Sequence, residues 1–183
     1  MKRHSTTPIV FALTSIVAAL SPFDVSGLTS HQPNGNPSGQ VNYYRIAFSV
    51  NSTNSGKAQS GYCAKFWGDN SWLQEEAYSV NVPTGQWISC DTSEGAYDGG
   101  APFQFQLFPN FSIGNFSLAI KEDLEDGESA YSMNHITNKT SDYTCQINPQ
   151  QLPYNVVHAS GDCSQPKGSK PFLFTASPED PTI

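Results

Sequence analysis

Three histidines lie outside the first twenty residues, and histidine is the side chain best suited to acid–base or metal chemistry near neutral pH. His31, His135 and His158 are far apart in the sequence. No pair has the two- or four-residue spacing that places two imidazoles on one face of a strand or helix. Val156 and Val157 precede His158, so we interpret it as a structural histidine. No G-x-S-x-G, H-E-x-x-H, P-loop or G-x-G-x-x-G motif is present, and we expect no catalytic residue, metal site or cofactor.

His31 offers one alternative. If processing made His31 the first residue of the mature chain, its α-amino group and imidazole could hold copper, as in secreted oxidative polysaccharide enzymes. That start requires cleavage after Ser30, well beyond the apolar N-terminal stretch. We therefore keep copper binding as a minor alternative.

An acidic segment is the second candidate site. It contains five carboxylates that could gather a cation or meet a basic partner: Glu122, Asp123, Glu125, Asp126 and Glu128. The EF-hand pattern fails because Gly127 does not stand at the sixth position from a suitable Asp. We therefore interpret the segment as a solvated loop, and treat Glu122, Asp123, Glu125 and Asp126 as candidate binding residues.

Sugar chemistry is the third possibility. Glu75 and Glu76 could supply half of a glycosidase pair, which needs two carboxylates about 5–9 Å apart. Three tryptophans, Trp67, Trp72 and Trp87, could stack on sugar rings. We expect Trp67 and Trp87 to be buried or half-buried in a sheet. Trp72 lies in a polar stretch, so we expect it to be exposed and count it as a candidate binding residue.

The cysteines indicate an oxidising compartment. There are four, Cys63, Cys90, Cys145 and Cys163, with no C-x-x-C pair. An even number in a small exported chain indicates two disulfides, for which three connectivities are possible. We favour Cys63–Cys90 and Cys145–Cys163, since each pair joins strands that are neighbours along the chain. A zinc site would need tighter spacing of Cys and His than this sequence has.

Export is also indicated by the N-terminus. A basic start precedes an apolar stretch over residues 8–20, the pattern of a secretory signal peptide. The stretch is too short to span the ~30 Å hydrocarbon core of a membrane. Small residues at Val17 and Ala19 permit cleavage after Ala19, while Val25 and Gly27 permit a later cut. We predict a secreted, extracellular protein.

Four N-glycosylation sequons support export. They begin at Asn51, Asn110, Asn115 and Asn138. If Phe116 points into a core, alternation along the strand turns Asn115 outward, where a glycan fits.

The net charge argues against two classes of partner. The chain carries −7, with only nine Lys and Arg residues, and removing the two basic residues of the signal peptide makes it −9. Nucleic acids and acidic membranes are bound by clustered Lys and Arg. We therefore expect neither as a partner.

Strands must position these candidates, because apolar residues recur at every second position. The clearest stretches are 44–50, 61–67, 78–82, 86–90, 103–107 and 116–120, and weaker ones are 130–136, 143–147, 156–159 and 172–175. The side chains expected to point inward are Phe103, Phe105, Phe116, Leu118 and Ile120. No stretch shows the helical period over ten residues. We predict an all-β fold, a compact antiparallel β-barrel or sandwich of about ten short strands with two disulfides.

Composition divides the chain into four segments. We predict a signal peptide over 1–19, a flexible polar leader over 20–40, the β-domain over 41–176 and a tail over 177–183. The leader is inferred because Ser, Gly, Pro, Asn and Gln dominate residues 20–40, without apolar periodicity.

Several short motifs follow one another in a recognisable order. They are the alternating strand at 44–50, Cys63-Ala-Lys-Phe-Trp67, Trp87-Ile-Ser-Cys90, Phe103-Gln-Phe105, and then Cys145 and Cys163. In this order they resemble the Alternaria major allergen family of secreted fungal proteins, over roughly residues 41–176. The resemblance implies a compact antiparallel β-barrel with the two sequential disulfides and no catalytic site.

The resemblance also implies a function. It points to secretion by a fungus and to a virulence effector, elicitor or allergen-like protein that binds a host protein or small ligand. Some members of the family are linked to flavonoid-type molecules at a dimer interface. This chain lacks the additional N-terminal cysteine that bridges that dimer, so we expect a monomer or a non-covalent dimer. The alternative is a carbohydrate-binding module or a small secreted polysaccharide-active enzyme, which a planar row of exposed aromatics or two facing carboxylates would favour.

Overall fold

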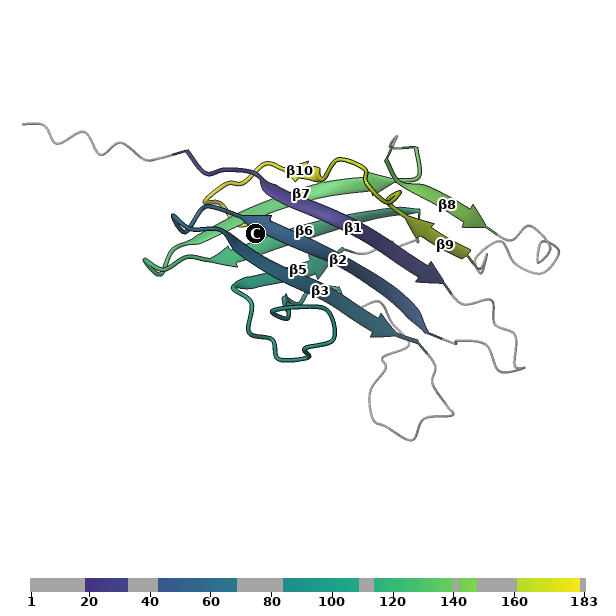
Figure 1. Ribbon diagram of the computed structural model, residues 1–183, viewed down its shortest axis with the longest axis horizontal. Coiled ribbons are helices and arrows are strands. Elements are labelled where there is room, and N and C mark those ends of the chain that lie inside the picture. The colour runs from purple at the N-terminus through teal and green to yellow at the C-terminus, as the bar shows by residue number, and fades with distance from the viewer. Residues whose placement is uncertain are drawn as a thin grey trace, which may run out of the picture.

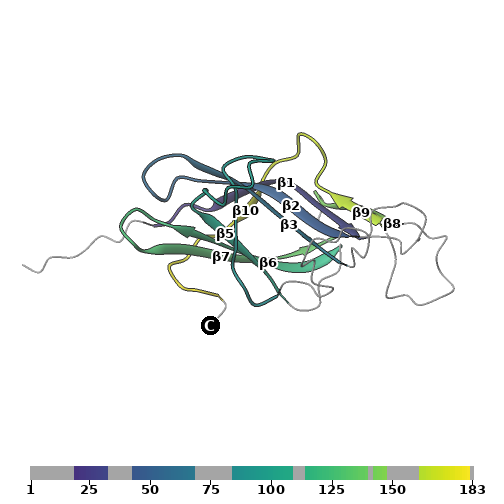
Figure 2. The same cartoon turned by 90° about the horizontal axis from the view of Figure 1, so that it is seen from below.

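Two stacked antiparallel β-sheets make up the fold (Figures 1 and 2). The computed structural model describes residues 19–32, 43–68, 84–108, 114–139, 142–147 and 161–181. The strands of these ranges are β1 Phe23–Gln32, β2 Tyr44–Ser52, β3 Gln59–Trp67, β4 Ile88–Ser89, β5 Phe103–Leu107, β6 Asn115–Asp123, β7 Ser129–Thr137, β8 Thr144–Ile147, β9 Gly161–Ser164 and β10 Phe172–Phe174.

Sheet A has the order β3-β2-β1-β9-β8, and β1 is its centre. One side of β1 pairs with β2. The other side is shared, since β10 pairs with the first residues of β1 and β9 with the last. Sheet B has the order β4-β5-β6-β7, and Figure 2 shows it as a second layer lying against sheet A.

The core lies between the sheets and is rich in aromatic rings. Phe48 of sheet A meets Phe105 of sheet B edge to face, with ring centroids 5.4 Å apart. Phe23 and Phe103 make a second such contact at 6.3 Å. The residues predicted to point inward are confirmed as core, with at most 2% of any side chain exposed: Phe103, Phe105, Phe116, Leu118 and Ile120. Burial of each such side chain stabilises the fold by about 1.5–3 kcal/mol.

The predicted flexible leader over 20–40 is wrong for its first half. Residues 23–32 form β1, the central strand of sheet A. The register shifts between Ser26 and Thr29, where Gly27 has a φ of +63°. This bulge needs a residue that tolerates positive φ. Inward-facing residues alternate on both sides of it, but across the bulge two successive inward-facing residues are three positions apart instead of two. The strand was missed because its apolar positions are out of phase across the bulge.

The position of β1 bears on N-terminal processing. A cut after Ala19 leaves β1 whole, since the strand begins at Phe23. A cut after Gly27 would remove all of its residues that pair with β10, and a cut after Ser30 would also remove most of its pairs with β2. A mature chain that begins at His31 therefore conflicts with the fold, and so does the copper alternative.

Both favoured disulfides are confirmed, and they have different roles. Cys145 and Cys163 lie directly opposite each other on β8 and β9, so this bond joins neighbours within sheet A. Cys63 lies on β3, whereas Cys90 follows β4. The Cys63–Cys90 bond therefore connects the two sheets rather than two strands of one sheet.

The sandwich, not the barrel, is the correct form of the predicted all-β fold. The sheets do not close on each other, so the barrel implied by the family resemblance is wrong for the described residues. Only Ile88–Ser89 of the predicted strand at 86–90 forms a strand, which pairs with β5. The predicted strands at 78–82 and 156–159 lie outside the described residues.

The β-domain also extends beyond residue 176, its predicted C-terminal boundary. Ser177, placed by the sequence in the tail, exchanges two backbone hydrogen bonds of 2.7 Å with Tyr131 on β7. Among the described residues no helix is long and apolar enough to cross a membrane.

Candidate functional site

A row of chemically capable side chains crosses the outer face of sheet A. His31 of β1 lies opposite Asp162 of β9 on one side and Arg45 of β2 on the other. Arg45 in turn lies opposite Phe66 of β3. Alternate residues of a strand face opposite sides of the sheet, and the neighbouring positions of these strands contribute to the core. We call Asp162, His31, Arg45 and Phe66 the outer row.

The first part of the outer row is a histidine–carboxylate pair. His31 Nδ1 lies 2.8 Å from Asp162 Oδ1, and the carboxylate, as an acceptor, favours the tautomer with a proton on Nδ1. The side chain of Asp162 is 74% exposed and that of His31 is 28% exposed. Nε2 of His31 is buried and has no hydrogen-bond partner in the described part of the chain.

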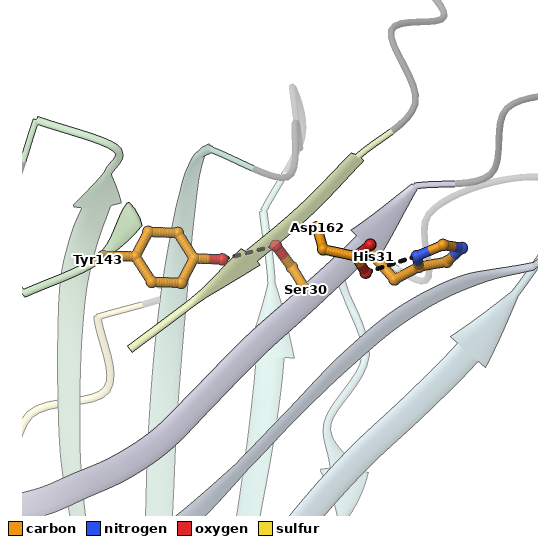
Figure 3. Close-up of polar contacts among 4 residues, drawn as sticks. All are labelled: Ser30, His31, Tyr143 and Asp162. Carbon is orange, nitrogen blue, oxygen red and sulfur yellow. Dashed lines mark hydrogen bonds and ion pairs between the residues drawn. The ribbon is translucent and has the colours of Figure 1, made fainter. Parts of the chain in front are cut away.

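The neighbouring serine does not complete a catalytic triad. Ser30 precedes His31 on β1 and therefore points to the opposite, inner side of the sheet. Figure 3 shows Ser30 turned to the hydroxyl of Tyr143, 2.6 Å away, and His31 turned to Asp162. Burial raises the pKa of Tyr143, against the opposing effect of the Ser30 hydrogen bond, so the phenol stays neutral. The Ser30–Tyr143 pair is a buried structural contact.

Arg45 is held in place by two side chains of the neighbouring strand β3. Its guanidinium carbon lies 5.5 Å from the ring centroid of Phe66, a cation–π contact. Nη2 donates a 3.0 Å hydrogen bond to the hydroxyl of Tyr62, which itself donates to Glu94 Oε1 at 3.3 Å. Burial raises the pKa of the Tyr62 phenol, and the nearby Arg45 opposes that rise. Guanidinium has five N–H donors, so Arg45 can be positioned by these contacts and still offer donors to a partner.

The aromatic residues of this face lie at steep angles. Tyr43 contacts His31 with an interplanar angle of 62° and Phe66 with one of 77°. A flat platform for sugar stacking requires coplanar rings, so these contacts do not meet the condition that favours the carbohydrate-binding alternative.

The predicted solvated acidic loop is wrong for Glu122. This residue lies on β6 and is fully buried. Its Oε2 accepts hydrogen bonds from Ser52 Oγ at 2.6 Å and Asn54 Nδ2 at 3.3 Å. Because these donors come from β2 and the turn after it, Glu122 connects the ends of the two sheets and is not available to a partner.

The other acidic candidates are at the surface and engaged locally. Asp123 Oδ1 pairs with Lys121 at 2.7 Å, and Glu125 pairs with Lys57. Asp126 accepts a 3.0 Å hydrogen bond from the backbone N–H of Glu128. This geometry gives the segment less free negative charge than its composition suggests.

The remaining sequence candidates divide by position. Trp72, Glu75, Glu76 and His158 lie outside the described residues. The predicted burial of the other two tryptophans is confirmed: Trp67 is 1% exposed, and Trp87 is half-buried against Tyr131.

His135 and three of the four sequon asparagines lie at the surface. His135 Nδ1 is 3.1 Å from Ser117 Oγ. Within the described ranges no three His, Cys, Asp or Glu side chains are grouped to hold a metal ion. Asn51, Asn115 and Asn138 are exposed, as glycan attachment requires, and Asn110 lies outside the described residues.

Sequence reasoning missed the outer row, although part of its signal was present. Arg45 occupies an outward position of the strand predicted at 44–50, and Phe66 one of the strand at 61–67. An arginine and an aromatic ring on outward positions of adjacent strands can be paired only once the register is known. His31 could not be added, because it fell within the predicted leader.

Comparisons with known proteins add no relatives. No family model, no curated protein and no solved structure matches this chain.

Proposed function

We propose that this chain is a secreted, non-catalytic recognition protein that binds a host protein through the outer row. In this proposal it acts as a fungal effector, elicitor or allergen-like protein, the class of function that the resemblance of its sequence motifs implies. The observation that carries the proposal is the outer row itself: a positioned arginine among aromatic rings, on the outer face of sheet A.

The composition of this surface supports a protein partner. Tyr and Arg are the residues that, with Trp, most often dominate the binding energy of protein interfaces. Tyr43, Tyr62, Arg45 and Phe66 are half-buried, so their side chains are already restricted before binding. Restriction before binding lowers the entropic cost of forming an interface.

Several features support export. Two disulfides are typical of proteins that fold in an oxidising compartment. Three of the four sequon asparagines are exposed in the described residues. Cleavage after Ala19 would leave the complete sandwich.

Export is tested by expression in a eukaryotic secretory host. We expect the protein in the medium, beginning at Leu20, with a mass that falls after enzymatic deglycosylation. A protein retained in cells with Met1 intact would contradict export.

Binding is tested with matched variants. We expect Arg45→Ala and Phe66→Ala to weaken binding to the host-tissue partner at least tenfold, while both variants remain folded. The control is Lys121→Ala, which removes a half-buried cation from the outer face of sheet B. Equal binding by wild type, both outer-row variants and the control would contradict the proposed surface.

Trp72 remains a separate prediction. β3 ends at Trp67, next to Phe66 of the outer row, and Trp72 follows five residues later in the sequence. We expect Trp72→Ala to weaken the same interaction without lowering the melting temperature.

A further inference from the structure

A pocket lies at the end of the sandwich opposite the outer row, and the residues shortly before β1 line it. Its volume is about 580 Å³, and Ala19 and Leu20 form part of its wall. Leu124, Ala176 and Pro178 supply other apolar parts of that wall. Leu20 also packs against the hydrophobic core, so this part of the chain is built into the fold.

The polar side of the same pocket is acidic. Asp126 and Glu128, from the turn between β6 and β7, line it together with Asn54. The backbone N–H of Ser21 donates a 2.7 Å hydrogen bond to Asn54 Oδ1. Asn54 Nδ2 donates in turn to the buried Glu122, so the residue after Leu20 is connected to the core through one side chain.

Hydrolysis of the Ala19–Leu20 peptide bond would change the charge at this position. The reaction consumes one water, releases residues 1–19 with a carboxylate on Ala19, and gives Leu20 a new α-amino group. Near neutral pH that group is largely an ammonium, whose ordinary pKa is about 7.7–8.0. An ammonium next to carboxylates is stabilised in its charged form.

We propose that the amino terminus made by this cleavage is a structural part of the mature protein. The side chain of Leu20 forms part of the apolar wall of the pocket, and its α-ammonium is held by Asp126 and Glu128. Processing thus replaces an uncharged amide by a cation in an acidic pocket, and stabilises the end of the sandwich only after the signal peptide has gone. This inference rests on the proposed export but not on the outer row.

The other charged groups near this end are the buried Glu122, Asp123 with Lys121, the pair Lys57–Glu125, and Glu179, which follows the lining residue Pro178 in the sequence. Oε2 of Glu122 has two donors, whereas its Oε1 is buried and has no hydrogen-bond partner among the described residues. Lys57 is paired with Glu125, which leaves Asp126 and Glu128 as the carboxylates of the pocket wall.

The experiment compares two secreted forms of the full mature chain. One begins at Leu20, and the other carries a Gly-Ser insertion between Ala19 and Leu20, which can move the ammonium by about 7 Å. We expect the insertion to lower the melting temperature by about 2–4 °C. We also expect faster amide hydrogen exchange over residues 124–128.

A charge-neutral double variant identifies the partners. Asp126→Asn with Glu128→Gln should lower the melting temperature of the Leu20 form and remove the effect of the insertion. The matched control, Asp98→Asn with Asp162→Asn, removes two exposed carboxylates elsewhere and should leave that effect unchanged. An insertion effect that persists in the Asp126/Glu128 variant would overturn the proposal.

The pH dependence gives a second readout. The proposed contact raises the pKa of the α-amino group, so its stabilisation is present below the ordinary pKa and is lost as pH rises through the raised one. We expect NMR titration to show the raised pKa, and the difference in melting temperature to disappear at alkaline pH. An ordinary pKa, or equal melting of the two forms at neutral pH, would overturn the inference while leaving export intact. A secreted chain with a different mature start would overturn this inference but not export, whereas a chain retained in cells with Met1 intact would overturn both.

Discussion

Asp162 and Glu122 are both strand carboxylates with hydrogen-bond donors from other strands, but they lie in opposite environments. The Asp162 side chain is 74% exposed and pairs with His31 on the outer face of sheet A. Glu122 is fully buried and accepts from Ser52 and Asn54. A buried carboxylate without its donors would be costly, whereas an exposed one keeps water as a substitute partner.

The difference separates the two ends of the sandwich by role. At the end around Glu122, loss of Ser52 or Asn54 would take a donor from a buried carboxylate, so we expect substitutions there to lower stability. The outer row can change its side chains at small structural cost, which is what a recognition surface requires.

The largest expected effect tests the buried end. Glu122→Ala leaves the Ser52 hydroxyl and the Asn54 amide without their acceptor, and we expect unfolding free energy to fall by about 3–5 kcal/mol. Chemical denaturation measures it. The control is Glu125→Ala, an exposed member of a surface ion pair, for which we expect a change of no more than about 1 kcal/mol. Equal effects of the two variants would remove the distinction between buried and surface carboxylates.

Removing each disulfide in turn tests whether the two ends of the sandwich respond differently. Replacing either pair by alanines should cost about 3 kcal/mol, since the two bonds close loops of similar length. Cys145→Ala with Cys163→Ala should also increase hydrogen exchange at Asp162, which neighbours Cys163 on β9. In the variant Cys63→Ala with Cys90→Ala, the amides of β9 should exchange no faster than the variant's global unfolding allows. Similar exchange of β9 in both double variants would contradict this local role.

A matched pair of amide substitutions should show a smaller effect at the outer row. Asp162→Asn is expected to change the unfolding free energy by no more than about 1 kcal/mol, because the carboxylate is exposed. Glu122→Gln should cost more than that, since the amide nitrogen replaces an acceptor in a fully buried position. Urea titration of both variants measures the difference. A larger loss for Asp162→Asn would reverse the assignment of roles.

The smallest expected effect is at Asp98, in the turn after β4. Backbone N–H groups of Gly100 and Thr92, with the Thr92 hydroxyl, hold the pKa of Asp98 below its ordinary value. The stabilisation is therefore present above the ordinary pKa and is lost as pH falls through the lowered one. We expect residues 91–100 to exchange amide hydrogens faster at acid pH and Asp98→Asn to do so already at neutral pH. Unchanged exchange in the variant would contradict this account.

Much of the fold could be predicted from local patterns. Strict alternation identified β2, β5 and β6, because each has one face in the core and one outside. The bulge at Gly27 broke the same pattern in β1, so a central strand was taken for a leader. Glu122 was misplaced for a related reason: a carboxylate in an acidic segment gives no local sign of donors about seventy residues away in sequence.

The sequence by itself determined the all-β class and the inward aromatic residues, because these depend on alternation. It favoured one of three possible cysteine pairings, from closeness along the chain, and the structure confirmed that pairing. Only the tertiary structure decided that two open sheets stack and that Cys63–Cys90 connects them. It also decided which carboxylate is buried and which side chains form the outer row. Asp162 and His31 are 131 residues apart in sequence and become neighbours only through the register of β1 and β9. Register between distant strands is fixed by the packing of the whole core, which no local pattern contains.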